Sequence, residues 1–298
     1  MPRSRPFCAD ESRAHDEPLH ATASRVDHWL LIEYRSLWSH DAFAGSGLSE
    51  QVKSHLREQQ AARPRTRLLF IRSRPRRTGA SLVAYSASSG ETQVELRRVE
   101  FEHYRELSGI DLAGGAGDPV EHPLLLVCTH GKHDPCCARY GRPLHDALAD
   151  EVDAEWLWQS THIGGDRFAG NLVCLPYGLY YGRLDGPGAA LVLDELLAGR
   201  IHLDTYRGRS CYPFAVQAAE HAVRAATGLL GLDDVRVVDA HRREGGAWTV
   251  AVAARNRGIQ DVELSEELGE LVHLTCGAEE LRRPRRYVVT ARRERPDP

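Results

Sequence analysis

The sequence predicts a mixed α/β (α+β) protein with two similar lobes of mixed sheet flanked by helices. A small C-terminal helix with an antiparallel sheet extends them. Short apolar runs typical of buried strands alternate with helical segments, and a rough β, α, β, β-hairpin order occurs twice. The chain has 298 residues, of which 42% are apolar, so it can build a proper core and fits about two domains.

The first lobe is predicted over residues 26–110. WLLIEY from Trp29 and the later RLLFIRSR are typical of buried strands, and between them Leu48 to Gln60 forms a helix capped by Ser49. ASLVAYSAS and TQVELRRVEF then form a hairpin that turns at residues 88–91. The polar residues 1–25 lack periodicity, so we expect a mobile or loosely docked arm in which Cys8 is incidental.

The second lobe is predicted over residues 118–205, after the glycine-rich linker IDLAGGAGDP that begins at Ile110. HPLLLVC is a buried strand, Ala138 to Glu151 a helix and EWLWQST the next strand. NLVCLPYGLYYGRL forms a hairpin, and the helix from Ala189 to Ala198 closes the lobe.

Residues 206–298 form the predicted extension. A helix begins near Pro213, a hairpin turns over Gly245 and Gly246, and VELSEELGELVHL and RRYVVTARRE add β structure. We expect a small antiparallel sheet packed against the helix. The basic run RRPRRYVVTARRER is interpreted as a solvated, partly mobile tail rather than a docking surface for an acidic redox partner.

Composition narrows the possible partners and the compartment. The formal net charge is -4 with acids and bases interspersed, which favours neither nucleic acid nor a membrane as partner. No signal-like apolar region opens the chain and no apolar run approaches a membrane span, so we expect a cytoplasmic protein. The seven cysteines are an odd number, which favours metal ligation or simple burial over a disulfide framework.

Candidate metal ligands lie on two glycine-containing loops. Eight residues separate Cys128 from Cys137, and two glycines lie between His162 and Asp166. Together these residues offer two thiolates, one imidazole and one carboxylate. Such donors serve both iron and zinc, so iron–sulfur, zinc and no metal all remain open from the residues alone.

The segments CTHGKHDPCCARYGRPL and THIGGDRFAGNLVCLPYGLYYGRL resemble the signature blocks of the sucrase/ferredoxin-like family. A weaker resemblance includes WLLIE and RGRSCYP, so that it covers Trp29 to Gly228. It implies two thioredoxin-like lobes, the first degenerate and the second similar to thioredoxin-like 2Fe–2S ferredoxins. The family's ligands are two cysteines with eight residues between them and two histidines in an H-x-x-x-H loop. Cys128, Cys137 and His162 match this pattern.

The second histidine of the pattern is replaced by Asp166. Three interpretations follow: Asp166 binds iron through a carboxylate oxygen, Cys136 substitutes on a shifted loop, or the site holds no cluster. Because iron accepts carboxylate as well as imidazole, we place Asp166 first.

Nearby residues have simpler interpretations. A disulfide between the neighbours Cys136 and Cys137 would be strained and reducible. His130 and His133 are expected to surround the ligands rather than to bind metal. Cys174, Cys211 and Cys276 are expected to be small core residues.

The resulting hypothesis is an electron-transfer or redox-sensing protein that carries a 2Fe–2S cluster and works with a redox protein partner. It would be an electron carrier rather than an enzyme. The alternatives are a thiol-based oxidoreductase that uses Cys136 or Cys137, and a zinc-stabilised interaction module. Glycoside hydrolysis is disfavoured because the sequence marks no suitable pair of carboxylates.

Overall fold

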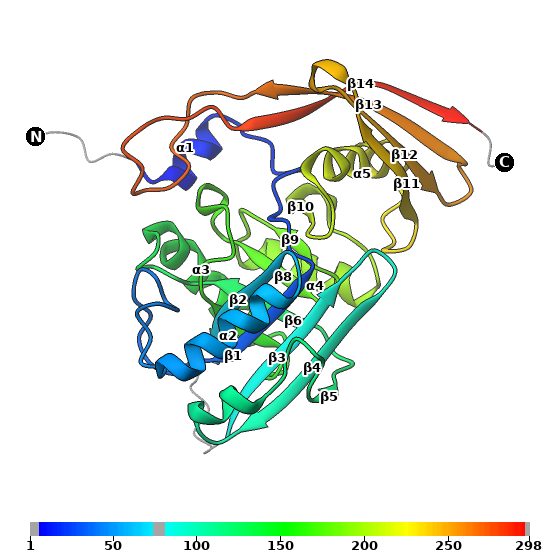
Figure 1. The fold of residues 1–298 in the computed structure, drawn as a ribbon. Helices are drawn as coiled ribbons and strands as arrows, with labels where there is room; N and C mark the ends of the chain where they lie inside the picture. Colours follow the sequence, from blue (N-terminus) through cyan, green and yellow to red (C-terminus); the bar gives the residue numbers. More distant parts are fainter. Residues whose placement is uncertain (1–5, 74–80, 296–298) are drawn as a thin grey trace, which may run out of the picture.

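A computed structural model describes residues 6–73 and 81–295 and contains two β-sheets with helices packed against them (Figure 1). The strands of the large sheet are β1 His28–Glu33, β2 Thr66–Arg72, β3 Leu82–Ser89, β4 Val94–Phe101, β5 Asp118–Pro119, β6 Leu124–Cys128, β7 Leu157–Ser160, β8 Leu172–Leu175, β9 Leu179–Tyr181 and β10 Tyr206–Arg209. The strands of the small sheet are β11 Val235–Arg242, β12 Trp248–Ala254, β13 Ile259–Leu268 and β14 Arg285–Arg295. The mixed α+β class is confirmed.

Five α-helices and four 3₁₀ turns complete the described part of the chain. The helices are α1 Cys8–Ala14, α2 Glu50–Ala62, α3 Pro135–Ala149, α4 Gly186–Leu197 and α5 Phe214–Thr227. The 3₁₀ turns are η1 Tyr104–Gly109, η2 Asp166–Phe168, η3 Leu203–Thr205 and η4 Glu244–Gly246. None of the helices in the described ranges has the length and apolar character that crossing a bilayer requires.

The two halves of the large sheet have the same strand order. In the first half β1 pairs parallel with β2 across α2, and antiparallel with β3, which pairs with β4. In the second half β6 pairs parallel with β7 across α3, and antiparallel with β8, which pairs with β9. The predicted repetition is therefore present. An antiparallel pairing of β2 with β7 joins the halves into one ten-stranded sheet.

The division into units at 26–110, 118–205 and 206–298 remains a prediction. β5 lies at the start of the second unit but pairs with β4, at the edge of the first half. The predicted hairpin of the first lobe is present, although its turn lies at Gly90 to Gln93 rather than at residues 88–91.

Alternation along the buried strands sends side chains to two faces of the large sheet. In β6, Leu125 and Val127 pack with residues of α3 and α4, whereas Leu126 and Cys128 pack in a core that also holds Trp29 and Trp158. This second core spans both halves of the sheet. Cys128 therefore ends its strand on the face where the two halves share a core.

The small sheet packs on α5, as the sequence predicts, through buried residues such as Val216, Val223, Val250 and Val262. β13 and β14 pair antiparallel over ten residue pairs, from Ile259 with Arg295 to Leu268 with Arg285. The prediction that the basic C-terminal run is a partly mobile tail is therefore wrong for Arg285 to Arg295. An exposed strand can be rich in arginine, because its backbone forms the sheet hydrogen bonds while the long side chains extend into solvent.

The expectation of a mobile or loosely docked N-terminal arm is also wrong for residues 6–25, while residues 1–5 of that arm lie outside the described part of the chain. Cys8 and Ala9 of α1 are buried, and Glu17 accepts hydrogen bonds from Arg167 at 2.9 Å and from Ser12 at 2.8 Å. The Ser12 contact is local, but Arg167 lies 150 residues further along the chain. Local periodicity carries no signal of such contacts, which is why the segment looks unstructured in the sequence.

Candidate metal centre

The connection from β6 to α3 places two cysteines at one end of the large sheet. Cys128 is the last residue of β6, and Asp134 caps α3 by accepting a hydrogen bond from the backbone N–H of Cys136 at 2.8 Å. Pro135 occupies the first turn, where a missing N–H costs nothing. The helix thus begins three residues before the predicted Ala138, and Cys137 lies in its first turn.

Gly141 allows α3 to lie directly against the end of β6. A Cβ atom at this position would lie 1.9 Å from the carbonyl oxygen of Cys128. Without a side chain there, the second turn of α3 can lie against the end of the strand. As a result the ligand atoms of Cys128, Cys137 and His162 lie within 4.8 Å of one another.

The conformation of the loop that carries His162 and Asp166 is fixed by two glycines and by hydrogen bonds to its backbone carbonyl oxygens. Gly164 and Gly165 have φ angles of +100° and +83°, which side-chain-bearing residues rarely adopt. The carbonyl oxygens of residues 163, 164 and 165 each accept a side-chain hydrogen bond, from Arg67 at 2.6 Å, Arg207 at 3.0 Å and Asn171 at 2.8 Å respectively.

Arg207 is a site-supporting residue that the sequence reasoning missed. Its guanidinium is buried and also donates to Asn171 Oδ1 at 2.8 Å and to the carbonyl of Thr22 at 2.6 Å. Burial lowers the pKa of Arg207 to about 10. In the sequence it appears only as the first residue of the weakly matching RGRSCYP, and nothing local marks it as buried.

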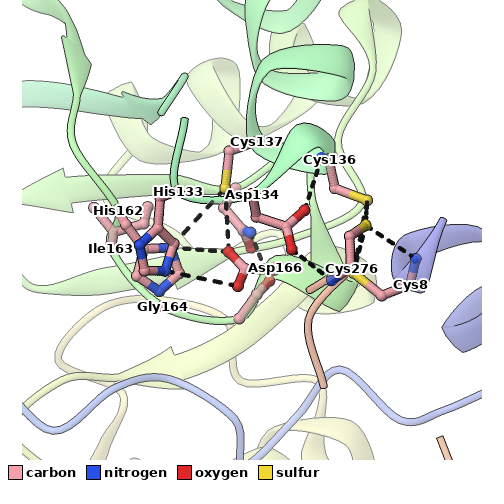
Figure 2. A network of polar contacts seen from close by, with 12 residues as sticks. Cys8, His133, Asp134, Cys136, Cys137, His162, Ile163, Gly164, Asp166 and Cys276 are labelled. Carbon is pink, nitrogen blue, oxygen red and sulfur yellow. Dashed lines mark hydrogen bonds and ion pairs between the residues drawn. The ribbon is translucent and has the colours of Figure 1, made fainter. Parts of the chain in front are cut away.

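Of the four predicted ligands, Asp166 contacts Cys137 and His162 (Figure 2), and Cys128 forms a group with the same two residues. Cys137 Sγ lies 3.2 Å from Asp166 Oδ1 and 3.9 Å from His162 Nδ1. His162 Nδ1 lies 2.9 Å from the same Asp166 oxygen. Asp166 is 2% exposed, so its charge must be balanced by these neighbours.

Mutual charges shift the pKa values at this site. Burial acts to lower the pKa of His162, but Asp166 and Cys128 outweigh it and raise that pKa to about 9. Burial acts to raise the pKa of Asp166, yet the His162 ring brings it below its usual value. The pKa of Cys128 lies below its ordinary value because Cys137 donates a hydrogen bond to it, and the pKa of Cys137 is raised by that bond and by burial. These shifts all favour the charged forms of Cys128, Asp166 and His162 in the metal-free site.

Cys136 belongs to a different group of side chains. Its sulfur points away from Cys137, toward Cys8 Sγ at 3.6 Å and Cys276 Sγ at 3.3 Å (Figure 2). In this arrangement it does not take the place of Asp166. The expectations that Cys8 is incidental and that Cys276 is a small core residue do not describe these contacts, and Cys276 is half-buried.

Two further histidines lie beside the candidate ligands. The ring of His133 stacks on that of His162 with centroids 4.0 Å apart, and His133 Nε2 lies 4.0 Å from Asp166 Oδ2. His130 is next in the row, 5.7 Å from His133, and its Nε2 lies 2.7 Å from the carbonyl oxygen of Ser39. The three rings line one side of a pocket of about 350 Å³. Their expected role around the ligands remains a prediction.

The fold and the site define a class: an α+β protein in which cysteine and histidine side chains, typical ligands of soft metals, gather on two loops in one half of the large sheet. The chain belongs to the sucrase/ferredoxin-like family, whose model matches residues 19–208, more than half of the chain.

Curated relatives are similar over a shorter stretch. Proteins named altered inheritance of mitochondria protein 32 are 32% identical over 100 residues in Meyerozyma guilliermondii and 34% identical over 118 residues in Eremothecium gossypii. These matches cover 30% and 34% of this chain, and 35% and 36% of the relatives. The chain thus spans about a third of the length of these relatives. No solved structure matches it significantly.

Proposed function

We propose that this protein binds a 2Fe–2S cluster through Cys128, Cys137, His162 and Asp166 and serves in electron transfer or redox sensing. The observation that carries the proposal is the convergence of these donors, which come from two loops separated by a helix and a strand. Membership of a family named for ferredoxin supports it. The site residues are offered as ligands, and none is proposed as a general acid, base or nucleophile.

The donor set suits iron. Thiolates are the usual ligands of iron–sulfur clusters, and imidazole replaces two of them in some centres. Iron also accepts a carboxylate oxygen, although that is a harder ligand. When bound, such a cluster accepts and releases one electron at a time. The chain's contribution would be to set the charge and the polarity around it, through Asp166, the neighbouring His133 and the buried Arg207.

Metal binding at this site should compete with protons. Cys128 and Cys137 must bind as thiolates and His162 as a neutral ring. Because the pKa of His162 is raised to about 9 in the metal-free site, the ring must release a proton before its Nδ1 can bind metal at neutral pH. Reconstitution should therefore become more favourable as the pH rises from 7 to 9.

The partner and the location are part of the same proposal. A separate redox protein would supply or accept the electron, and we expect the chain to work in the cytoplasm. The curated relatives carry a name that refers to mitochondrial inheritance, and that name describes the relatives alone.

Iron and inorganic sulfide in anaerobically purified protein test the proposal, together with visible absorption. Cys128→Ser should lose iron, sulfide and colour, whereas Cys211→Ser should keep all three, because Cys211 packs under the small sheet. Colourless wild-type protein with zinc that disappears in Cys128→Ser would favour the zinc module. Thiol–disulfide turnover without iron would favour the oxidoreductase, for which the diverging sulfurs of Cys136 and Cys137 are poorly placed.

A further inference from the structure

A second group of cysteines lies outside the proposed cluster site and gathers three distant segments. Cys8 begins α1, Cys136 lies in the first turn of α3, and Cys276 lies in the connection between β13 and β14. Their three Sγ–Sγ distances are 3.6 Å for Cys8 to Cys136, 3.3 Å for Cys136 to Cys276 and 3.5 Å for Cys276 to Cys8. The three sulfurs thus form a nearly regular triangle (Figure 2).

Asp134 adds a carboxylate to this triangle. It is 1% exposed, and one of its oxygens lies within 4.8 Å of all three sulfurs. Its two oxygens accept backbone hydrogen bonds from Cys136 at 2.8 Å and from Cys276 at 2.6 Å. Each oxygen keeps a further lone pair. Within residues 6–73 and 81–295, no arginine, lysine or histidine forms an ion pair with Asp134, so no cationic side chain in these ranges partners it.

Simple packing and a disulfide both explain the group poorly. Buried cysteines commonly act as small apolar residues, but packing alone does not explain why the capping carboxylate of Asp134 lies against all three sulfurs. A disulfide would need two sulfurs to approach to about 2.05 Å, and it would leave the third thiol and the carboxylate without a role.

We propose that Cys8, Cys136, Cys276 and Asp134 bind one Zn²⁺ ion. With Zn–S bonds of about 2.3 Å, neighbouring sulfurs of a tetrahedral site lie about 3.8 Å apart, close to the observed triangle. A 2Fe–2S cluster places two protein ligands on each iron and a 4Fe–4S cluster places one, so neither would hold three cysteine sulfurs this close together. Cu(I) prefers soft ligands throughout, whereas zinc also accepts the oxygen of Asp134.

This inference goes beyond the proposed cluster and does not rest on it. The zinc ion would tie α1 and the connection between β13 and β14 to the start of α3. The same two segments already meet through His273, whose Nδ1 lies 2.8 Å from Glu11 Oε2. Because Cys136 directly precedes Cys137, the ion would also hold the turn that presents Cys137 to the other site.

Metal analysis of the full-length chain separates the two sites. The wild-type protein, equilibrated with Zn²⁺ and desalted, should retain one zinc ion that does not depend on its iron content. Cys8→Ser and Cys276→Ser should each weaken zinc binding at least about tenfold, whereas Cys211→Ser should not. Cys128→Ser should lose iron and keep this zinc, so failure of the cluster proposal would not hide the result.

Two measurements keep the test decisive if a serine variant folds poorly. Asp134→Asn preserves a good helix cap but removes the charge, so it should weaken zinc binding by about ten- to hundredfold while the helix content stays unchanged. Zinc-edge X-ray absorption of the wild-type protein should show three sulfur ligands and one light ligand.

Three outcomes would overturn the zinc site. The first is wild-type protein that binds no zinc, and the second is zinc binding that is equal in Cys8→Ser and Cys211→Ser. The third is a disulfide among Cys8, Cys136 and Cys276, detected by mass spectrometry under non-reducing conditions in protein purified anaerobically.

Discussion

Asp166 occupies a position where an acidic side chain is unusual: buried, on a glycine-rich loop, and in contact with a thiol and an imidazole. The spacing in the sequence could place it near the other candidate ligands. It could not reveal that one oxygen, Oδ1, contacts both Cys137 and His162. Those contacts depend on Arg207 and Asn171, which fix the loop from other elements.

Changing Asp166 tests whether it binds metal. Asp166→Ala removes one of four donors and should lower the iron retained per chain, whereas Asp166→His should retain iron and shift the visible spectrum. Iron assays and absorption spectra after desalting provide the measurement. If both variants match the wild type in iron content and spectrum, Asp166 is not a ligand.

The His162 ring makes the stability of the metal-free protein depend on pH. Its pKa is about 9 in the folded chain against an ordinary value of 6.5, so the folded state holds the proton more tightly. This stabilisation is complete below about pH 6.5 and is lost as the pH rises through about 9, a change on the order of 3 kcal/mol. Urea unfolding of chelator-treated protein from pH 6 to 9.5 measures it. His162→Gln should flatten the profile, and an equal slope in both proteins would contradict the assignment.

Among the elements, α3 matters most, because its first turn carries cysteines of two separate groups. The sequence predicts this helix but places its start too late, at Ala138 rather than at Pro135. It also predicts β1, β2, the two hairpins and α5. It misses α1 and the order of β14, because Cys8 and the C-terminal arginines are held by partners that lie far away in the sequence.

Gly141→Ala should separate α3 from β6. Alanine normally stabilises a helix relative to glycine by about 1 kcal/mol, but here its Cβ would collide with the carbonyl of Cys128. We expect a net loss of about 1–3 kcal/mol in the free energy of unfolding, together with less iron per chain. Gly109→Ala is the matched control, because a Cβ there meets nothing within 4 Å. Equal stability and iron content in the two variants would show that close approach at Gly141 is unimportant.

At the scale of the whole molecule, the repeated strand order was predictable, but the joining of the two halves was not. Two residue pairs, Ile71 with Ser160 and Arg72 with Gln159, connect β2 to β7. Such edge pairing depends on where each half places its outer strand, and no periodicity in either strand encodes it. The joint also explains why a single core, containing both Trp29 and Trp158, lies under the two halves.

The N-terminal segment is expected to stabilise the whole fold through Glu17. Its side chain pairs with Arg167 and is 3% exposed, so Glu17→Ala would leave the arginine partly buried without its partner. We expect a loss of about 3 kcal/mol in the free energy of unfolding and faster hydrogen exchange over residues 6–20. Glu280→Ala, which breaks an exposed pair with Arg282, should change stability by less than about 0.5 kcal/mol. Similar effects of the two substitutions would mean that the segment contributes little.

Pulsed electron paramagnetic resonance of the reduced, full-length protein tests the ligand set of the proposed cluster most directly. Ligation by Cys128, Cys137, His162 and Asp166 predicts strong coupling of the electron spin to a single ligand nitrogen, and this coupling should be absent in His162→Cys. Two strongly coupled nitrogens, no coupled nitrogen, or iron-free protein would contradict it.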